Sequence, residues 1–376
     1  MSILRAMSEQ TPTPPEQGTA LRRGWTTGAC ATAATKAAFT ALVSGHFPDP
    51  VQVTLPKNRT PAFSLAVQEQ GDGTAMAGII KDAGDDPDVT HGALIRATVR
   101  LGVPGSGVTF AAGEGVGMVT RAGLPIPAGE PAINPSPRAM IQQAVSEVAA
   151  QFNVPGDVQV EISVPGGAEI AIETLNPRLG IVGGLSILGT TGVVIPFSCS
   201  AWIHSIQRGI DVARAAGLPH VAGSTGRTSE KAVQAHHDLP EEALIDMGDF
   251  IGGMLKYLRT HPIPRITVAG GMAKITKLSQ GFMDVHSRRG QADLGQLADL
   301  AATAGADETC QDRIRQSNTV AEAFDHARAA GVPIGDAVAQ AALHFALHLI
   351  DPQQSQLEIL VFDRSGHLVG GATSAP

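Results

Sequence analysis

The sequence predicts an α/β plus α+β fold, in which an N-terminal α+β domain is joined by a glycine-rich crossover to a Rossmann-like, doubly wound α/β domain. Three features predict it: alternating β-branched runs around a helix in the first half, a glycine-dense stretch almost without charge, and three strand–loop–helix units after it. The 376 residues suffice for two domains. We expect a disordered tail at 1–20, an α+β domain at 21–178, the crossover at 179–210, the α/β domain at 211–350, and a C-terminal strand and tail at 351–376.

Composition and charge exclude several classes of protein. The net charge of −8 argues against a nucleic-acid partner, which would require a basic face. Cys30, Cys199 and Cys310 are far apart and form no C-x-x-C pair, so we expect no disulfide framework, zinc site or iron–sulfur site. The first twenty residues contain no apolar signal segment, so we expect a cytoplasmic protein without a membrane partner. The sequence leaves open whether the protein forms a homo-oligomer.

The first predicted helix covers Ala29–Val43, because alanine is the best helix former. Thr26 or Thr27 can cap its start, and Gly45 suits its end. Two interpretations of the start stay open. The Thr26–Gly28 segment offers N–H and O–H donors where anions bind, or the helix simply packs tightly on a sheet.

Strands are expected next at 51–58, 63–70 and 74–82, and they lead into an aspartate-rich loop. The loop contains Asp82, Asp85, Asp86 and Asp88, with His91 just beyond. Oxygen ligands at this density can hold a metal, but the spacing does not match an EF-hand, and a turn whose Asx side chains bond their own backbone explains them better. Because Gly84 and Pro87 favour the turn, we expect no protein-bound metal.

The glycines between 113 and 117 resemble a cofactor loop, but no helix opens directly after them, so we interpret them as a strand kink or bulge. A helix is expected to open at Ser136–Pro137. Strands at 157–164 and 168–175 should close this half.

The crossover is too rich in glycine, and too clearly broken by Pro196, to span a membrane. We expect Ile181, Val182, Leu185, Ile187 and Leu188 to form a buried seam. Successive N–H groups around Thr190 and Thr191 can form an anion-binding nest.

In the second half, ligands should bind at the carboxyl ends of the parallel strands. The predicted cofactor-binding residues there are Gly223, Thr225, Gly226, Glu230, Asp246, Asp249, Gly270 and Gly271. Asp246 or Asp249 could hold a ribose hydroxyl, and an alternative for Asp249 is a helix N-cap.

Several blocks of the chain, taken together, resemble one family. They are LRRGWTTGACATAATKAA, IIKDAGDDPDVTHG, GEGVGMVT, GEPAINPSPRAMI, EISVPGG, NPRLGIVGGLSILGTTGVVIP and KLSQGFMDVHSR. In this order, from about Leu21 to about Gly370, they resemble the CbiD family, the cobalt-precorrin-5B C(1)-methyltransferases of cobalamin biosynthesis. The loop VAGSTGRTSE departs from the family's T-P-G-N-x-G-E form but keeps a glycine and Glu230.

The resemblance implies that S-adenosylmethionine methylates carbon 1 of a cobalt-bound tetrapyrrole, cobalt-precorrin-5B, to give cobalt-precorrin-6A. Cobalt would arrive within the substrate. His91, His204 and His286 are the candidate bases by residue type. The carboxylate arms of the substrate need cations and N–H or O–H donors, and the candidates are Thr26, Thr27, Gly28, Lys36, Arg138, Arg178, Thr190, Thr191 and Lys274.

Two other classes of function remain as alternatives. A non-catalytic corrinoid-binding protein would bind the macrocycle without S-adenosylmethionine. A nucleotide-binding phosphotransferase would use Thr26–Gly28 as an anion cradle and would require magnesium and a nucleoside triphosphate.

Overall fold

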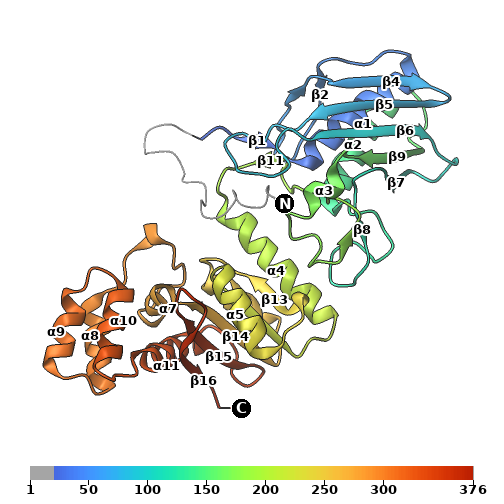
Figure 1. The fold of residues 1–376 in the computed structure, drawn as a ribbon. Helices are drawn as coiled ribbons and strands as arrows, with labels where there is room; N and C mark the ends of the chain where they lie inside the picture. The colour runs from blue at the N-terminus through green and yellow to red at the C-terminus, as the bar shows by residue number, and fades with distance from the viewer. Residues whose placement is uncertain (1–20, 376) are drawn as a thin grey trace, which may run out of the picture. The chain divides into compact units, whose positions relative to one another are not determined.

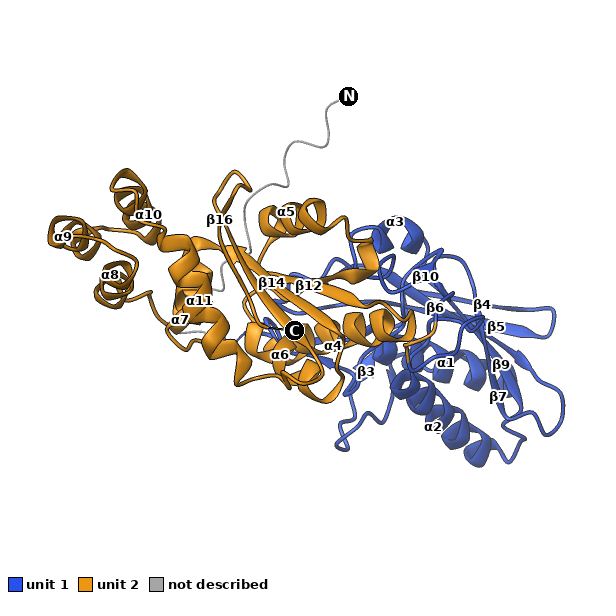
Figure 2. Ribbon diagram, turned by 90° about the horizontal axis from the view of Figure 1, so that it is seen from below, with its two compact units in different colours: residues 1–121, 125–198 blue, residues 122–124, 199–376 orange. Residues whose placement is uncertain are grey.

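The computed structural model describes residues 21–375 and divides the chain into two compact units (Figure 1, Figure 2). Unit 1 comprises residues up to 121 and 125–198, and unit 2 comprises 122–124 and the residues from 199 onward. The predicted tail at 1–20 lies outside the described residues. Helices and mixed sheets in both units confirm the mixed α/β class. No helix between residues 21 and 375 is both long and apolar enough to cross a membrane.

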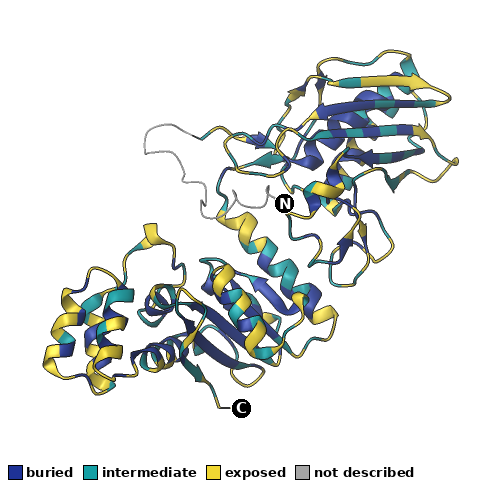
Figure 3. Cartoon of the chain, viewed as in Figure 1, coloured by how far each residue is buried: buried dark blue, intermediate teal, exposed yellow. Residues whose placement is uncertain are grey.

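Unit 1 is built on a five-stranded sheet whose strands are antiparallel, except that β7 runs parallel to β9. In spatial order the strands are β4 (Val67–Gly71), β5 (Thr74–Ile80), β6 (Leu94–Leu101), β9 (Val158–Ser163) and β7 (Val108–Ala112). Helix α1 (Thr27–Ser44) packs on β5 and β6 and against α2 (Pro135–Phe152). Figure 3 shows α1 almost wholly buried.

The alanines of α1 explain its position, because small side chains let the helix backbone lie close to the sheet. As predicted, Thr26 caps the helix by accepting a hydrogen bond from the Ala29 N–H at 3.2 Å. Gly45 ends it with a left-handed φ of 80°. The buried face includes Ala33, Ala37 and most of the other alanines.

The strand predicted at 168–175 is wrong, because the chain forms helix α3 (Gly167–Ala171) followed by turns. Gly166 reverses the chain after β9 with a φ of 73°. Gly167 then packs against backbone: an added Cβ would lie 2.4 Å from the Gly115 carbonyl oxygen. A strand cannot continue through this turn, although the residues after it alternate in polarity.

The other strands of unit 1 are two-residue pairings. They are β1 (Gly24–Trp25) with β11 (Val193–Val194), β2 (Val51–Gln52) with β3 (Ala62–Phe63), and β8 (Met118–Val119) with β10 (Ile181–Val182). The glycine-rich segment up to 198 is therefore mostly turns hydrogen-bonded to other parts of unit 1.

The expected burial of the apolar residues in this segment is correct in part. Ile181, Leu185 and Ile187 are buried, whereas Val182 and Leu188 are 58% and 50% exposed. From Cys199 the chain is helical, so 199–210 belongs to α4 (Cys199–Ala215).

Unit 2 contains a second five-stranded sheet, in which the first four strands are parallel and the last is antiparallel. The spatial order is β13 (Leu244–Asp246), β12 (His220–Ser224), β14 (Arg265–Gly271), β15 (Gln356–Phe362) and β16 (Leu368–Thr373). The three predicted strand–loop–helix units are confirmed, with helices α5 (Arg227–His237), α6 (Ile251–Thr260) and α7 (Met272–Ser279).

Alternate residues of these strands enter two different cores. Val221 and Ile266 belong to the large core, which also contains residues of α4, α6, α7 and α11 (Ile334–Leu347). Ala222 and Ala269 belong to a smaller core with Val233 of α5. Because successive strand residues face opposite sides, helices cover both faces of the sheet (Figure 2).

The remaining helices of unit 2 lie between β14 and β15 in the sequence. They are α8 (Leu294–Thr303), α9 (Glu308–Gln316), α10 (Val320–Ala329) and α11, and short 3₁₀ turns occur at η1 (Glu241–Ala243) and η2 (Ser287–Arg289).

Candidate functional site

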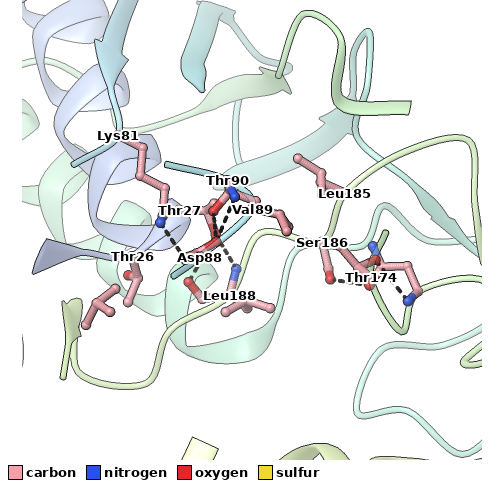
Figure 4. A pocket seen from close by; sticks show the side chains of 12 residues that line it. Thr26, Thr27, Lys81, Asp88, Val89, Thr90, Thr174, Leu185, Ser186 and Leu188 are labelled. Atoms are coloured by element: carbon pink, nitrogen blue, oxygen red, sulfur yellow. Dashed lines mark hydrogen bonds and ion pairs between the residues drawn. The ribbon is translucent and has the colours of Figure 1, made fainter. Parts of the chain in front are cut away.

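Unit 1 contains a pocket of about 160 Å³ beside the start of α1, with a lysine, an aspartate and several hydroxyl residues in its lining (Figure 4). It is lined by Thr26, Thr27, Lys81, Asp88, Val89, Thr90, Thr174, Asn176, Leu185, Ser186, Leu188 and Val194. Pockets that enclose a whole drug-sized ligand usually measure 300–1,000 Å³. This pocket therefore suits one polar side arm of a larger ligand.

The predicted anion cradle at Thr26–Gly28 uses most of its backbone donors within the fold. The N–H groups of Thr26 and Gly28 donate to the carbonyls of Gly192 (3.0 Å) and Leu188 (2.9 Å). Thr27 Oγ1 also accepts from the Leu188 N–H at 2.9 Å. Tight packing thus accounts for Gly28, whereas Thr26 and Thr27 still line the pocket.

Lys81 is the cation of the pocket, and sequence reasoning did not single it out. Its side chain is 1% exposed, and its Nζ lies 2.7 Å from Asp88 Oδ2. Asp88 Oδ1 accepts two further bonds, from the Thr90 N–H and hydroxyl. Burial raises the pKa of Asp88, but the charge and hydrogen bond of Lys81 and the Thr90 bonds outweigh it, so the pKa lies below its usual value. The sequence signal is a lysine directly after the apolar strand β5 and before the aspartates.

The other aspartates of this loop bond to Arg22 and Phe197 instead of Lys81. Asp82 pairs with Arg22, whose hydrogen bond is the main reason that the Asp82 pKa falls to about 2. Asp85 accepts from the Arg22 N–H at 2.6 Å and Asp86 from the Phe197 N–H at 2.8 Å. The local bonds of the turn interpretation are those that Asp82 and Asp88 accept from the Gly84 N–H (2.9 Å) and the Thr90 N–H (2.8 Å), while the bonds to Arg22 and Phe197 connect the loop to other segments.

Several predicted substrate contacts of unit 1 lie outside the pocket lining. Lys36 Nζ pairs with Glu147 at 2.6 Å. Arg138 bonds Glu130 and the carbonyls of Pro131 and Ile133, and its guanidinium lies over the Phe110 ring. Arg178 lies in the turns before the glycine-rich segment, and Thr190 and Thr191 lie within it. The Thr191 hydroxyl donates to the Val193 carbonyl at 3.4 Å.

Unit 2 brings the predicted cofactor residues to one edge of its sheet, because the carboxyl ends of its parallel strands meet there. Lys274 connects two of the loops: its Nζ lies 2.9 Å from Asp249 Oδ1 and donates to the Thr225 carbonyl at 2.8 Å. The N-cap interpretation of Asp249 is wrong, because Phe250 occupies the cap position of α6 and no side chain caps the helix.

The four glycines at this edge fall into two classes. A Cβ at Gly223 would lie 2.2 Å from Met254 Sδ, and one at Gly270 would lie 2.7 Å from Ile275 Cδ1, so both positions are closed by core packing. Gly226 and Gly271 have open space where a Cβ would point. Neither needs a left-handed backbone, since their φ values are 163° and −70°. The open space favours these two positions for ligand approach. Helix α5 begins directly after Gly226, and Glu230 lies in its first turn.

The three candidate bases do not form one cluster. His91 lies in unit 1, where its Nδ1 accepts from the Ala83 N–H at 3.1 Å. In unit 2, exposed His204 lies on α4, and His286 Nδ1 accepts from the Arg288 N–H at 3.1 Å before η2. The geometry assigns none of them as a general base.

A polar network at the opposite end of the unit 2 sheet escaped the sequence reasoning. His237 Nε2 lies 2.6 Å from Glu358 Oε2, and His220 Nε2 lies 2.8 Å from Thr267 Oγ1, which donates to the same Glu358 oxygen. Burial, followed by the charge of Arg265, lowers the pKa of His220 to about 4. Among residues 21–375 these two histidines and Glu358 could converge on a metal ion. Their bonds to one another, and Arg265 on the carboxylate, fit a structural network better.

The fold and these two regions define a two-unit, mixed α/β protein with a polar pocket in one unit and an open parallel-sheet edge in the other. Residues 14–196 match the CbiD family model, and residues 284–373 match the model of the CbiD C-terminal domain. The chain belongs to the CbiD family, which confirms the resemblance seen in the sequence.

Relatives of high identity span nearly the whole chain. A protein named cobalt-precorrin-5B C(1)-methyltransferase from Halorhodospira halophila is 66% identical, and the alignment covers 97% of this chain and 99% of the relative. One of the same name from Agrobacterium fabrum is 63% identical over 96% and 95%. The crystal structure of a cobalamin biosynthesis protein (cbiD) from Archaeoglobus fulgidus is 29% identical, covers 72% of this chain and 83% of that chain, and superposes with a TM-score of 0.38.

Proposed function

We propose that this protein methylates carbon 1 of cobalt-precorrin-5B to give cobalt-precorrin-6A, with S-adenosylmethionine as the methyl donor. The observation that carries the proposal is the 58–66% identity to proteins named for this reaction, over at least 93% of the chain. In the reaction, carbon 1 attacks the sulfonium methyl, a C–C bond forms, and the C–S electron pair leaves with S-adenosylhomocysteine. A macrocycle proton passes to a base.

We assign the pocket of unit 1 to a carboxylate arm of the tetrapyrrole. The Lys81 ammonium has three donors and gives one to Asp88, so two remain for an incoming acceptor. Thr26 and Thr27 line the same space. Asp88 compensates the buried charge of Lys81 before the substrate arrives, because an unpaired charge in this position would be strongly destabilising.

We assign S-adenosylmethionine to the carboxyl edge of the unit 2 sheet and regard this unit as the Rossmann-like domain of the prediction. Four parallel strands with helices on both faces support this assignment. So does Asp246, which ends β13 about 20 residues after Gly226, the spacing at which such domains place an acidic residue for the ribose. The enzyme's contribution is then mainly to hold donor and acceptor in position, which can supply up to about 7–11 kcal/mol of the barrier.

A glycine substitution that fills the open edge tests the cofactor assignment. Gly271→Val should weaken S-adenosylhomocysteine binding at least tenfold by isothermal titration, with an unchanged melting temperature, because its side chain enters open space. Gly71→Val is the matched control, since Gly71 of β4 in unit 1 also has open space around it. Equal affinity in both variants would move the cofactor site elsewhere. Tight binding of magnesium–ATP in place of S-adenosylhomocysteine would favour the phosphotransferase.

A further inference from the structure

Trp202 is a large aromatic residue that is fixed in place and yet 46% exposed. It lies in the first turns of α4, and its Nε1 donates to the Asp246 carbonyl at 3.2 Å. Its indole ring also lies against the loop after β13, because a Cβ at Gly248 would be 3.3 Å from three ring atoms. Gly248 has a left-handed φ of 52°, so this close approach uses a residue without a side chain.

Anchoring of this kind suits a stacking platform. A ring held by a hydrogen bond and a backbone contact loses little further conformational freedom when a ligand covers it. Its exposed surface offers an apolar π-face that can stack on any nucleobase. A purely structural tryptophan of the core would have been expected to bury most of its ring.

The position of Trp202 selects the ligand group. In doubly wound sheets, an acidic residue at the end of the second strand holds the ribose of a bound nucleotide. Here that residue is Asp246, at the end of β13, whose carbonyl is the anchor of the indole. The base is attached directly to the ribose, so it must lie within one ring's length of Asp246.

We propose that Trp202 binds the adenine of S-adenosylmethionine by stacking, and that it is a binding residue of the cofactor site. The proposal rests on the assignment of that site to the carboxyl edge of unit 2. Trp202 then recognises the adenosine group, which S-adenosylmethionine and S-adenosylhomocysteine share.

Fluorescence provides a direct test, because Trp25 and Trp202 are the two tryptophans of the chain. In Trp25→Phe the emission comes from Trp202 alone, and we expect S-adenosylhomocysteine to quench it with a saturable titration. In Trp202→Phe the remaining Trp25, which packs on Phe63 in unit 1, should not respond. A response of Trp25 with none from Trp202 would overturn the proposal.

Affinity measurements complete the test. Trp202→Leu keeps an apolar side chain but removes the π-face, and should weaken S-adenosylhomocysteine and adenosine by the same factor, roughly 5- to 150-fold. Trp202→Phe should recover most of that loss. Unchanged affinity in Trp202→Leu, or a loss for S-adenosylmethionine alone, would contradict adenine stacking while leaving the cofactor site in place. If Gly271→Val also leaves binding unchanged, the site assignment itself fails. Melting curves of both variants check that each is folded.

Discussion

At the scale of single residues, the unit 1 pocket depends on the pairing of Lys81 with Asp88. A lysine that is 1% exposed is destabilising unless a partner compensates its charge. Asp88 provides that partner, and Thr90 orients the carboxylate from its other oxygen. The same pair therefore serves both the fold and the proposed binding of a substrate arm, and a double substitution can separate the two.

Lys81→Met should weaken cobalt-precorrin-5B binding and lower the free energy of unfolding by about 1–3 kcal/mol, because Asp88 loses its partner. The combination Lys81→Met with Asp88→Asn should recover much of that stability, since no unpaired charge remains, but not the affinity. Urea unfolding and substrate titration measure the two effects. Normal substrate affinity in the double variant would show that Lys81 is only structural.

At the same scale, sequence reasoning found Thr26 and Thr27 because cap residues have a recognisable pattern. It missed Lys81 and Trp202, whose proposed roles depend on contacts made by distant segments: Leu185, Ser186 and Leu188 complete the pocket around Lys81, and Asp246 anchors Trp202. The substrate contacts predicted for Lys36 and Arg138 stay predictions; the two side chains pair with Glu147 and Glu130.

At the scale of elements, the network of His220, His237 and Glu358 ties α5 to the sheet of unit 2. His220 begins β12, His237 ends α5, and Glu358 lies in β15. Glu358 also contacts Arg265 of β14 at 3.1 Å, so α5, β14 and β15 meet at one carboxylate, and His220 of β12 joins them through Thr267. The protonation of His220 and Glu358 should therefore contribute to the acid sensitivity of this unit.

Acid should destabilise unit 2 in a defined window. The pKa of His220 is about 4 in the folded chain, below its ordinary 6.5, so the unfolded chain takes up the proton first as pH falls. Stability should decrease from about pH 6.5 to pH 4. Glu358, whose pKa is also lowered, should add a further loss as pH falls below its ordinary value of 4.5.

His220→Gln provides the control for this prediction, because glutamine keeps a polar partner for Thr267 but does not titrate. Urea unfolding at several pH values should give a shallower dependence between pH 6.5 and 4 in the variant. Parallel curves for variant and wild type would mean that His220 does not carry the effect.

Local signals determined how well the elements could be predicted. Helix α1 was predictable from its alanine content and its Thr26 cap, and the three strand–loop–helix units from their apolar periodicity. Both are present, although no side chain caps α5, α6 or α7. Residues 168–175 alternate like a strand, but the Gly166–Gly167 turn against Gly115 imposes a helix, a tertiary effect that periodicity does not contain. Leu188 is 50% exposed at the pocket, although the three residues before it are buried.

At the scale of the whole molecule, function was predictable because the family blocks extend along nearly the entire chain. Relatives at 66% and 63% identity likewise align over nearly its whole length. The sequence did not predict which unit would contain the proposed substrate site. We propose the pocket of unit 1 for the substrate and the carboxyl edge of the unit 2 sheet for the cofactor, while Lys274, expected at the substrate, connects two loops of that edge. Spacing along the chain could not reveal which of its cations share a unit.

The central claim is the transfer of one methyl group to carbon 1, and a labelled donor tests it most directly. Purified protein would be incubated without oxygen with cobalt-precorrin-5B and S-adenosylmethionine carrying a ¹³C methyl, and the tetrapyrrole analysed by mass spectrometry and NMR. The account predicts one labelled methyl on carbon 1 and one S-adenosylhomocysteine for each product formed. Binding of the tetrapyrrole with no labelled product and no S-adenosylhomocysteine would contradict it and would identify a corrinoid carrier instead.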